Sequence, residues 1–115
     1  MTRGWQFTLP NSGIAYNIWS LIQTQIVDPT FTQVTAPYMP KVVAYVRFYM
    51  NTASANTSNT ISIIDAITGQ EKRSISPGTN EFVDQMVSGN GINLDGYLAK
   101  PSANGCILDV SVTVQ

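Results

Sequence analysis

The chain of 115 residues contains no histidine and a single cysteine. Without histidine there is no Ser-His-Asp arrangement, and a zinc site would lack its commonest ligand. The one cysteine, Cys106, excludes an intrachain disulfide framework. Cys106 falls at an inward position of a predicted strand, which favours a buried thiol over a reactive one. This inventory predicts a protein that is not an enzyme.

Charged residues are also scarce, at 11% of the chain against about 25% in typical soluble domains. Ser, Thr, Asn and Gln take their place with 38 residues of the 115. Two interpretations stay open. A partner covers part of the surface, since interface cores are depleted in charge, or the chain is a neutral extracellular or viral β domain.

Basic residues form no stripe or patch of the kind that binds nucleic acid. The net charge is −1 and the six basic residues are scattered, so we expect no nucleic-acid partner. No apolar run approaches the length of a membrane span, and residues 1–5 lack the apolar core of a signal peptide. We therefore expect no membrane partner, and synthesis and folding in a cytoplasm.

Short runs with alternating or β-branched residues recur along the chain, separated by Gly, Pro and Asn. They predict strands at 5–9, 41–50, 60–67, 70–76, 81–87, 92–100 and 106–115, with an edge strand near 31–34. Apolar residues at 15, 18, 19, 22 and 26 predict one helix. The sum is a single domain over 1–115: mainly β, an antiparallel β-sandwich or jelly-roll-like fold with one short N-terminal helix.

The strand at 41–50 is bulky on both faces, which indicates a central strand or one covered by a partner. One predicted face carries Val42, Ala44, Val46, Phe48 and Met50. The other carries Val43, Tyr45, Arg47 and Tyr49. Tyr and Arg are enriched at interface hot spots, so the second face either contacts a partner or packs between sheets.

Two further aromatic residues, Phe31 and Tyr38, lie in a proline-containing connection at 28–40. We predict that Tyr45, Arg47, Tyr49, Phe31 and Tyr38 form the partner interface. Residues 1–12 and 28–40 are candidates for extended segments that reach across neighbouring subunits and add affinity by engaging several at once.

Carboxylates give only a weak indication of a metal site. Asp84 to Asp95 holds two acids, two asparagines and glycines, which distantly suits calcium. A turn that uses Asn and Gly for backbone reasons is the favoured interpretation. A two-carboxylate glycosidase is formally possible, but a chain this short hardly frames a deep cleft. We expect no cofactor and no metal.

Two parts of the sequence resemble small β-rich structural proteins of tailed bacteriophages. The first is GINLDGYLAK at 91–100, SANG at 102–105 and CILDVSV at 106–112. In such chains a strand leads through a short Ala/Ser/Asn/Gly turn to an alternating final strand. The second is the opening WQFTLPNSG at 5–13 before a short helix. The likeness covers about a third of the chain and carries over no functional residue.

The resemblance implies a place in the virion. It points to a capsid cement or decoration protein that binds the major capsid protein or other virion proteins and forms homo-oligomers, made in the host cytoplasm. A tail or fibre-base component is the alternative within that class. The alternative from another class is a carbohydrate-binding or receptor-binding β module, which should show coplanar exposed aromatic rings in a groove.

Overall fold

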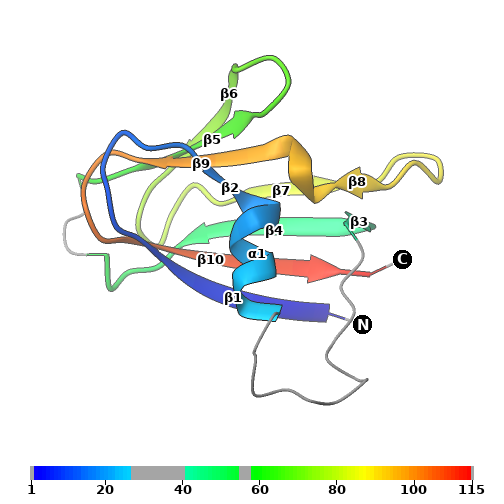
Figure 1. The fold of residues 1–115 in the computed structure, drawn as a ribbon, viewed down its shortest axis with the longest axis horizontal. Coiled ribbons are helices and arrows are strands. Elements are labelled where there is room, and N and C mark those ends of the chain that lie inside the picture. The colour runs from blue at the N-terminus through cyan, green and yellow to red at the C-terminus, as the bar shows by residue number, and fades with distance from the viewer. Residues whose placement is uncertain (1, 27–40, 55–57, 115) are drawn as a thin grey trace.

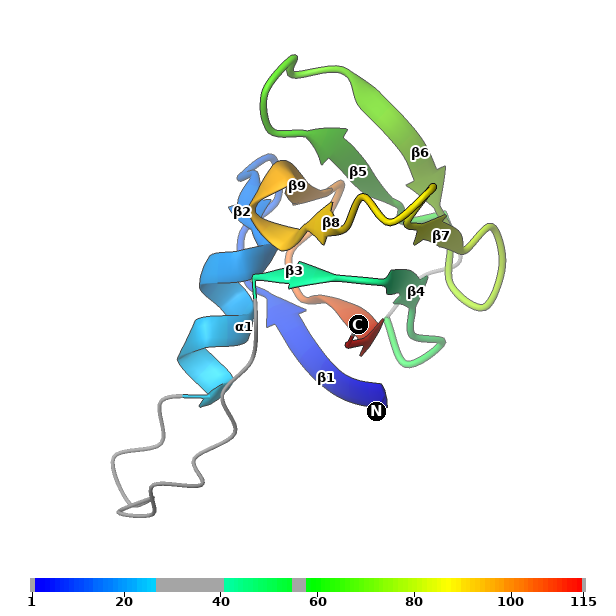
Figure 2. The same cartoon turned by 90° about the vertical axis from the view of Figure 1, so that its right-hand side faces the viewer.

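The computed structural model describes residues 2–26, 41–54 and 58–114. Within them the chain is mainly β, with antiparallel sheets and one α-helix, as the sequence predicts. Figures 1 and 2 show two four-stranded sheets lying one over the other, with the helix at one side. Predictions that fall on 27–40, including the edge strand near 31–34, lie outside the described residues.

Two sheets of four strands make up most of the fold. Sheet A has the strand order β1 (Thr2–Leu9), β10 (Cys106–Thr113), β4 (Tyr45–Met50) and β7 (Phe82–Gln85). Sheet B has the order β2 (Tyr16–Asn17), β9 (Tyr97–Pro101), β5 (Ile61–Asp65) and β6 (Glu71–Ile75). A third pairing joins β3 (Val42–Val43) to β8 (Ile92–Asn93), and the helical elements are α1 (Ile18–Ile26) and the 3-10 turn η1 (Leu94–Gly96).

The strand pairings are nested along the chain. β1 pairs with β10, β2 with β9, β4 with β7, and β5 with β6, all antiparallel. Outer and inner segments of the chain therefore alternate between sheets A and B. Two further pairings, β10 with β4 and β9 with β5, complete each sheet.

One hydrophobic core is shared by both sheets and α1. In β10 the inward residues are all buried: Cys106, Leu108, Val110 and Val112. This period-2 pattern was predicted from sequence and is confirmed. Phe7 and Leu9 of β1 are buried in the same way, while Trp5 is half-buried at the edge of the core.

The helix does not lie at the N-terminus, which corrects the predicted position. α1 begins at Ile18, after β1 and β2. Asn17 is its N-cap: its side-chain oxygen accepts a hydrogen bond from the Ser20 backbone N–H at 3.1 Å. Ala15 consequently lies outside the helix and is exposed, whereas Ile18 and Ile22 are fully buried. α1 lies beside the edges formed by β1 and β2 (Figure 2).

Two predicted strands are interrupted. The strand at 41–50 bends at Ala44, so Val43 is buried and Val42 exposed, the reverse of the predicted faces. The strand at 92–100 is broken by η1, where the Asn93 side chain accepts from the Asp95 backbone N–H. Each half therefore finds its own partner: β8 pairs with β3, and β9 pairs with β5 and β2.

Candidate contact surface

Tyr45, Arg47 and Tyr49 lie together on the side of β4 that faces away from the core. Their neighbours Val46, Phe48 and Met50 are fully buried. β4 is hydrogen-bonded on both edges, to β10 and β7, so the three side chains stand near the middle of sheet A. All three are half-buried, although none of the described strands of sheet B packs on them. The structure thus brings together the central trio of the predicted interface on a surface, not between sheets.

The surrounding residues are fixed by the strand registers, and we call the whole the outer A face. It consists of Tyr45, Arg47 and Tyr49 of β4, Val83 and Gln85 of β7, Asp109, Ser111 and Thr113 of β10, and Thr2, Gly4 and Gln6 of β1. Of these eleven residues, only Arg47 and Asp109 carry a formal charge. Figure 2 shows that α1 lies at the side of the sheets, so the helix does not cover the outer A face.

Arg47 is held in place on both sides. Its guanidinium forms an ion pair with Glu81, which directly precedes β7. The guanidinium carbon also lies 4.9 Å from the centre of the Tyr49 ring, a cation–π contact. An arginine that is already ordered loses less side-chain entropy when a partner covers it. Glu81 was not among the predicted site residues, because it is 34 positions from Arg47 and meets it only through the β4–β7 pairing.

The β10 and β1 part of the outer A face is polar and its groups bond to one another. Asp109 accepts hydrogen bonds from the side-chain amides of Gln6 at 3.1 Å and Asn51 at 2.9 Å. The hydroxyl groups of Thr2 and Thr113 lie 3.2 Å apart. Because these groups are already paired, a partner could cover them with little loss of hydrogen bonding.

The other predicted contact elements are placed differently. Phe31 and Tyr38, with the segment 28–40, lie outside the described residues. Residues 2–9 form β1 and pair along their whole length with β10. Residues 2–9 therefore belong to sheet A, and the role of 1–12 as a contact segment stays a prediction.

The two acids of the suggested calcium loop go to different partners. Asp84 accepts a hydrogen bond from the hydroxyl of Tyr97. Asp95 contacts the side-chain amide of Asn17 at 3.0 Å and the ammonium group of Lys41 at 3.3 Å. Among the residues that the structure describes, no group of three or more acidic or sulfur side chains is arranged to hold a metal ion.

No pattern in the sequence indicates the contacts that Tyr97 makes. Its ring is buried and lies against Phe48 and Phe82, with centroids 5.3 and 6.3 Å away. Burial, and then the hydrogen bond to Asp84, raise the pKa of Tyr97 well above its ordinary value. Asp84 is in sheet A and Tyr97 in sheet B, so this polar pair joins the sheets.

The thiol of Cys106 is buried, as predicted, and its sulfur lies 3.3 Å from the carbonyl oxygen of Ala103. None of the helices in the described ranges combines the length and hydropathy that crossing a bilayer requires.

Comparison with known proteins gives no assignment. The sequence matches no protein-family model and no curated protein, and the structure matches no solved structure.

Proposed function

We propose that the chain is a non-catalytic structural protein of a bacteriophage particle, which binds and stabilises the capsid surface as a cement or decoration protein. The observation that carries the proposal is the outer A face. It presents two tyrosines and an ordered arginine, the residue types of interface hot spots, on a surface with very few charges. The partner is the major capsid protein or a neighbouring copy of the chain.

The order of the strands supports the same proposal at the level of the fold. With the two-residue strands β3 and β8 set aside, eight strands pair in the nested order first with last. We infer that the two sheets form a β-sandwich of the jelly-roll type, in which a long antiparallel hairpin is rolled so that its arms alternate between sheets. Jelly rolls recur in viral capsid proteins, and also in lectins and cupins, so this support is an analogy.

A capsid-coating role also agrees with the chemistry that the chain carries. Binding to a protein surface needs a rigid scaffold and ordered anchors, and the chain has no histidine for general acid–base work. The low charge would limit repulsion among copies packed densely on a particle. Sheet A supplies rigidity because β4 is bonded on both edges.

The test is co-sedimentation of the purified protein with particles of the virus that encodes it. We expect the protein to pellet with particles at a saturable ratio and to stay in the supernatant without them. A protein that stays in the supernatant at every particle concentration would overturn the virion role. Pelleting with equal efficiency in the absence of particles would show self-assembly alone and would remove the capsid as the partner.

A further inference from the structure

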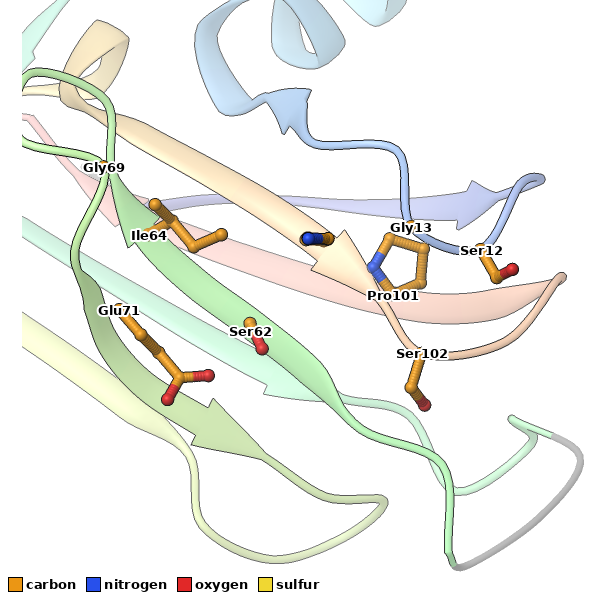
Figure 3. A pocket seen from close by; sticks show the side chains of 9 residues that line it. Ser12, Gly13, Ser62, Ile64, Gly69, Glu71, Pro101 and Ser102 are labelled. Atoms are coloured by element: carbon orange, nitrogen blue, oxygen red, sulfur yellow. The ribbon is translucent and has the colours of Figure 1, made fainter.

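A groove of about 480 Å³ crosses the outer face of sheet B, on the side of the molecule away from the outer A face. Its floor is Ser62 and Ile64 of β5 (Figure 3). Pro101 and Ser102 form one wall together with the loop residues Ser12 and Gly13, and Glu71 and Gly69 of the β5–β6 hairpin form the other. Lys100, which pairs in register with Ser62, also lines the groove. These residues lie far apart in the sequence and meet only through the strand order.

The wall formed by Ser12 and Gly13 is fixed to the end of β9. The Gly13 backbone N–H donates to the carbonyl oxygen of Pro101 at 2.9 Å, and the Ser12 backbone N–H donates to Oδ1 of Asn104 at 2.7 Å. Oγ of Ser102 accepts from the Thr60 backbone N–H at 2.8 Å. The groove is therefore preformed, and a ligand would not have to order it.

The opposite wall is fixed by the turn of the β5–β6 hairpin. The side chain of Asp65 accepts hydrogen bonds from the backbone N–H groups of Ile67 at 2.8 Å and Thr68 at 3.2 Å. Gly69 then closes the turn at φ 75°, its N–H donating to the Asp65 carbonyl oxygen at 2.8 Å. This turn sets the position from which Glu71 faces the groove.

The groove carries charges of both signs that do not neutralise each other. Lys100 pairs in register with Ser62, while Glu71 pairs with Ile64, so β5 lies between them. Within the described part of the chain, neither Lys100 nor Glu71 belongs to an ion pair. Three hydroxyl groups, of Ser12, Ser62 and Ser102, lie along the same groove.

These charged and hydroxyl groups limit the chemical classes of ligand that can bind in the groove. An anion such as phosphate would meet Glu71, a cation would meet Lys100, and an apolar ligand would bury both charges without partners. Ordinary small-molecule pockets are mostly apolar, whereas this lining is rich in hydroxyl and charged groups. A peptide cannot add as a strand here, because β5 is already paired on both edges.

We propose that this groove binds a neutral saccharide chain. Sugar hydroxyls both donate and accept, so different hydroxyls along the chain can accept from Lys100, donate to Glu71 and bond to the serines. Ile64, half-buried on the floor of the groove, provides the apolar surface for the carbon face of a ring. No aromatic side chain among the described residues lines the groove, so recognition here rests on hydrogen bonds and not on the aromatic rings expected of a typical carbohydrate module. The inference goes beyond the proposed capsid function and uses the opposite sheet, so either can fail without the other.

The test is a titration of the ¹⁵N-labelled protein, followed by backbone amide shifts. The probes are maltohexaose, cellohexaose and xylohexaose, with inorganic phosphate and free glutamine as the anionic and zwitterionic comparisons. Ligand concentrations reach about 10 mM, where a binding site with a Kd near 1 mM is mostly occupied. We expect saturable shifts at Ser62, Ile64 and Ser102 with at least one hexasaccharide, and none with phosphate or glutamine.

Substitutions of groove residues test whether the shifts arise from binding in the groove. Lys100→Ala and Glu71→Gln should each weaken binding about ten-fold, the effect of losing a hydrogen bond to a charged group. Arg73 is an exposed cation of β6 that does not line the groove. Arg73→Ala should therefore change the affinity for the saccharide less than two-fold. Unchanged core resonances of Leu108 and Val110 would show that each variant is folded.

Three results would overturn the proposal. The first is the absence of saturable shifts with all three hexasaccharides. The second is saturation by phosphate or glutamine instead. The third is sugar binding that is unaffected by both Lys100→Ala and Glu71→Gln, or whose shifts map to the outer A face.

Discussion

Tyr97 of β9 donates a hydrogen bond to the carboxylate of Asp84 in β7, and this bond joins the two sheets across the edge of the core. The ammonium group of Lys72 makes a cation–π contact with the same tyrosine ring, 5.6 Å from the ring centre. Nζ of Lys72 also lies 3.8 Å from Oδ2 of Asp65, in an ion pair. Strands β5, β6, β7 and β9 thus meet in one polar cluster beside Phe48 and Phe82.

The raised pKa of Tyr97 predicts a loss of stability at alkaline pH. The unfolded chain releases this proton near pH 10, the ordinary tyrosine value, while the folded protein retains it. Unfolding is therefore increasingly favoured as pH rises above 10, by at most about 1.4 kcal/mol per pH unit. Tyr97→Phe removes this dependence. Urea unfolding of both proteins from pH 8 to 11.5 should show a steeper decline for the wild type, and parallel curves would contradict the assignment.

The faces of β10 predict opposite outcomes for neighbouring substitutions. Val112 is fully buried and Ser111 lies on the outer A face. Val112→Asp places a charge in the core and should cost about 3 kcal/mol or more. Ser111→Asp should cost less than about 1 kcal/mol. The free energies of unfolding of the two variants measure this directly, and equal values would mean that the faces of β10 are misassigned.

Gly69 and Gly96 form a matched pair for testing the β5–β6 turn. A Cβ added at either position would meet no atom within 4 Å, but only Gly69 has a positive φ, of 75°. Gly69→Ala should therefore destabilise the protein by about 1–2 kcal/mol through backbone strain alone. Gly96→Ala should have a much smaller effect. A melting temperature that is lowered equally by both substitutions would show that the turn does not require the left-handed conformation.

Asp84 and Asp95 bond to Tyr97, Asn17 and Lys41, so we expect metal chelation to leave the protein unchanged. The melting temperature with EDTA should equal that without it, measured after dialysis of both samples. A drop of more than a few degrees would show that a bound ion contributes to folding.

Local patterns were sufficient to predict much of the fold. The alternation in 106–113 correctly gave the buried face of β10, and the strands predicted at 60–67 and 70–76 correspond to the paired strands β5 and β6. The same patterns failed where side chains redirect the backbone. Asn17 caps the helix and delays its start, and Asn93 bonds to the Asp95 backbone and breaks the strand. Both are local bonds from a backbone N–H to a side chain two or three residues earlier, which compete with regular structure and leave no trace in the hydrophobic periodicity.

The outer A face could likewise be predicted only in part from local patterns. Tyr45, Arg47 and Tyr49 share a face because strand side chains alternate, so their grouping followed from the sequence. The sequence left open whether that face was covered by the second sheet, and the structure places it outside. The Arg47–Glu81 ion pair and the groove depend on strand order, which no local pattern specifies.

The outer A face is tested most directly by the double variant Tyr45→Ala/Tyr49→Ala. Both rings lie outside the core, so thermal unfolding should change by only a few degrees, the loss of two cross-strand packing contacts. Co-sedimentation with particles should weaken about 30-fold or more, equivalent to about 2 kcal/mol. The control is Ile64→Ala/Leu98→Ala, which removes two half-buried apolar side chains from sheet B and should leave particle binding unchanged. Lost association with a nearly unchanged melting temperature is the result we predict, and undiminished particle binding by the tyrosine variant would contradict the account.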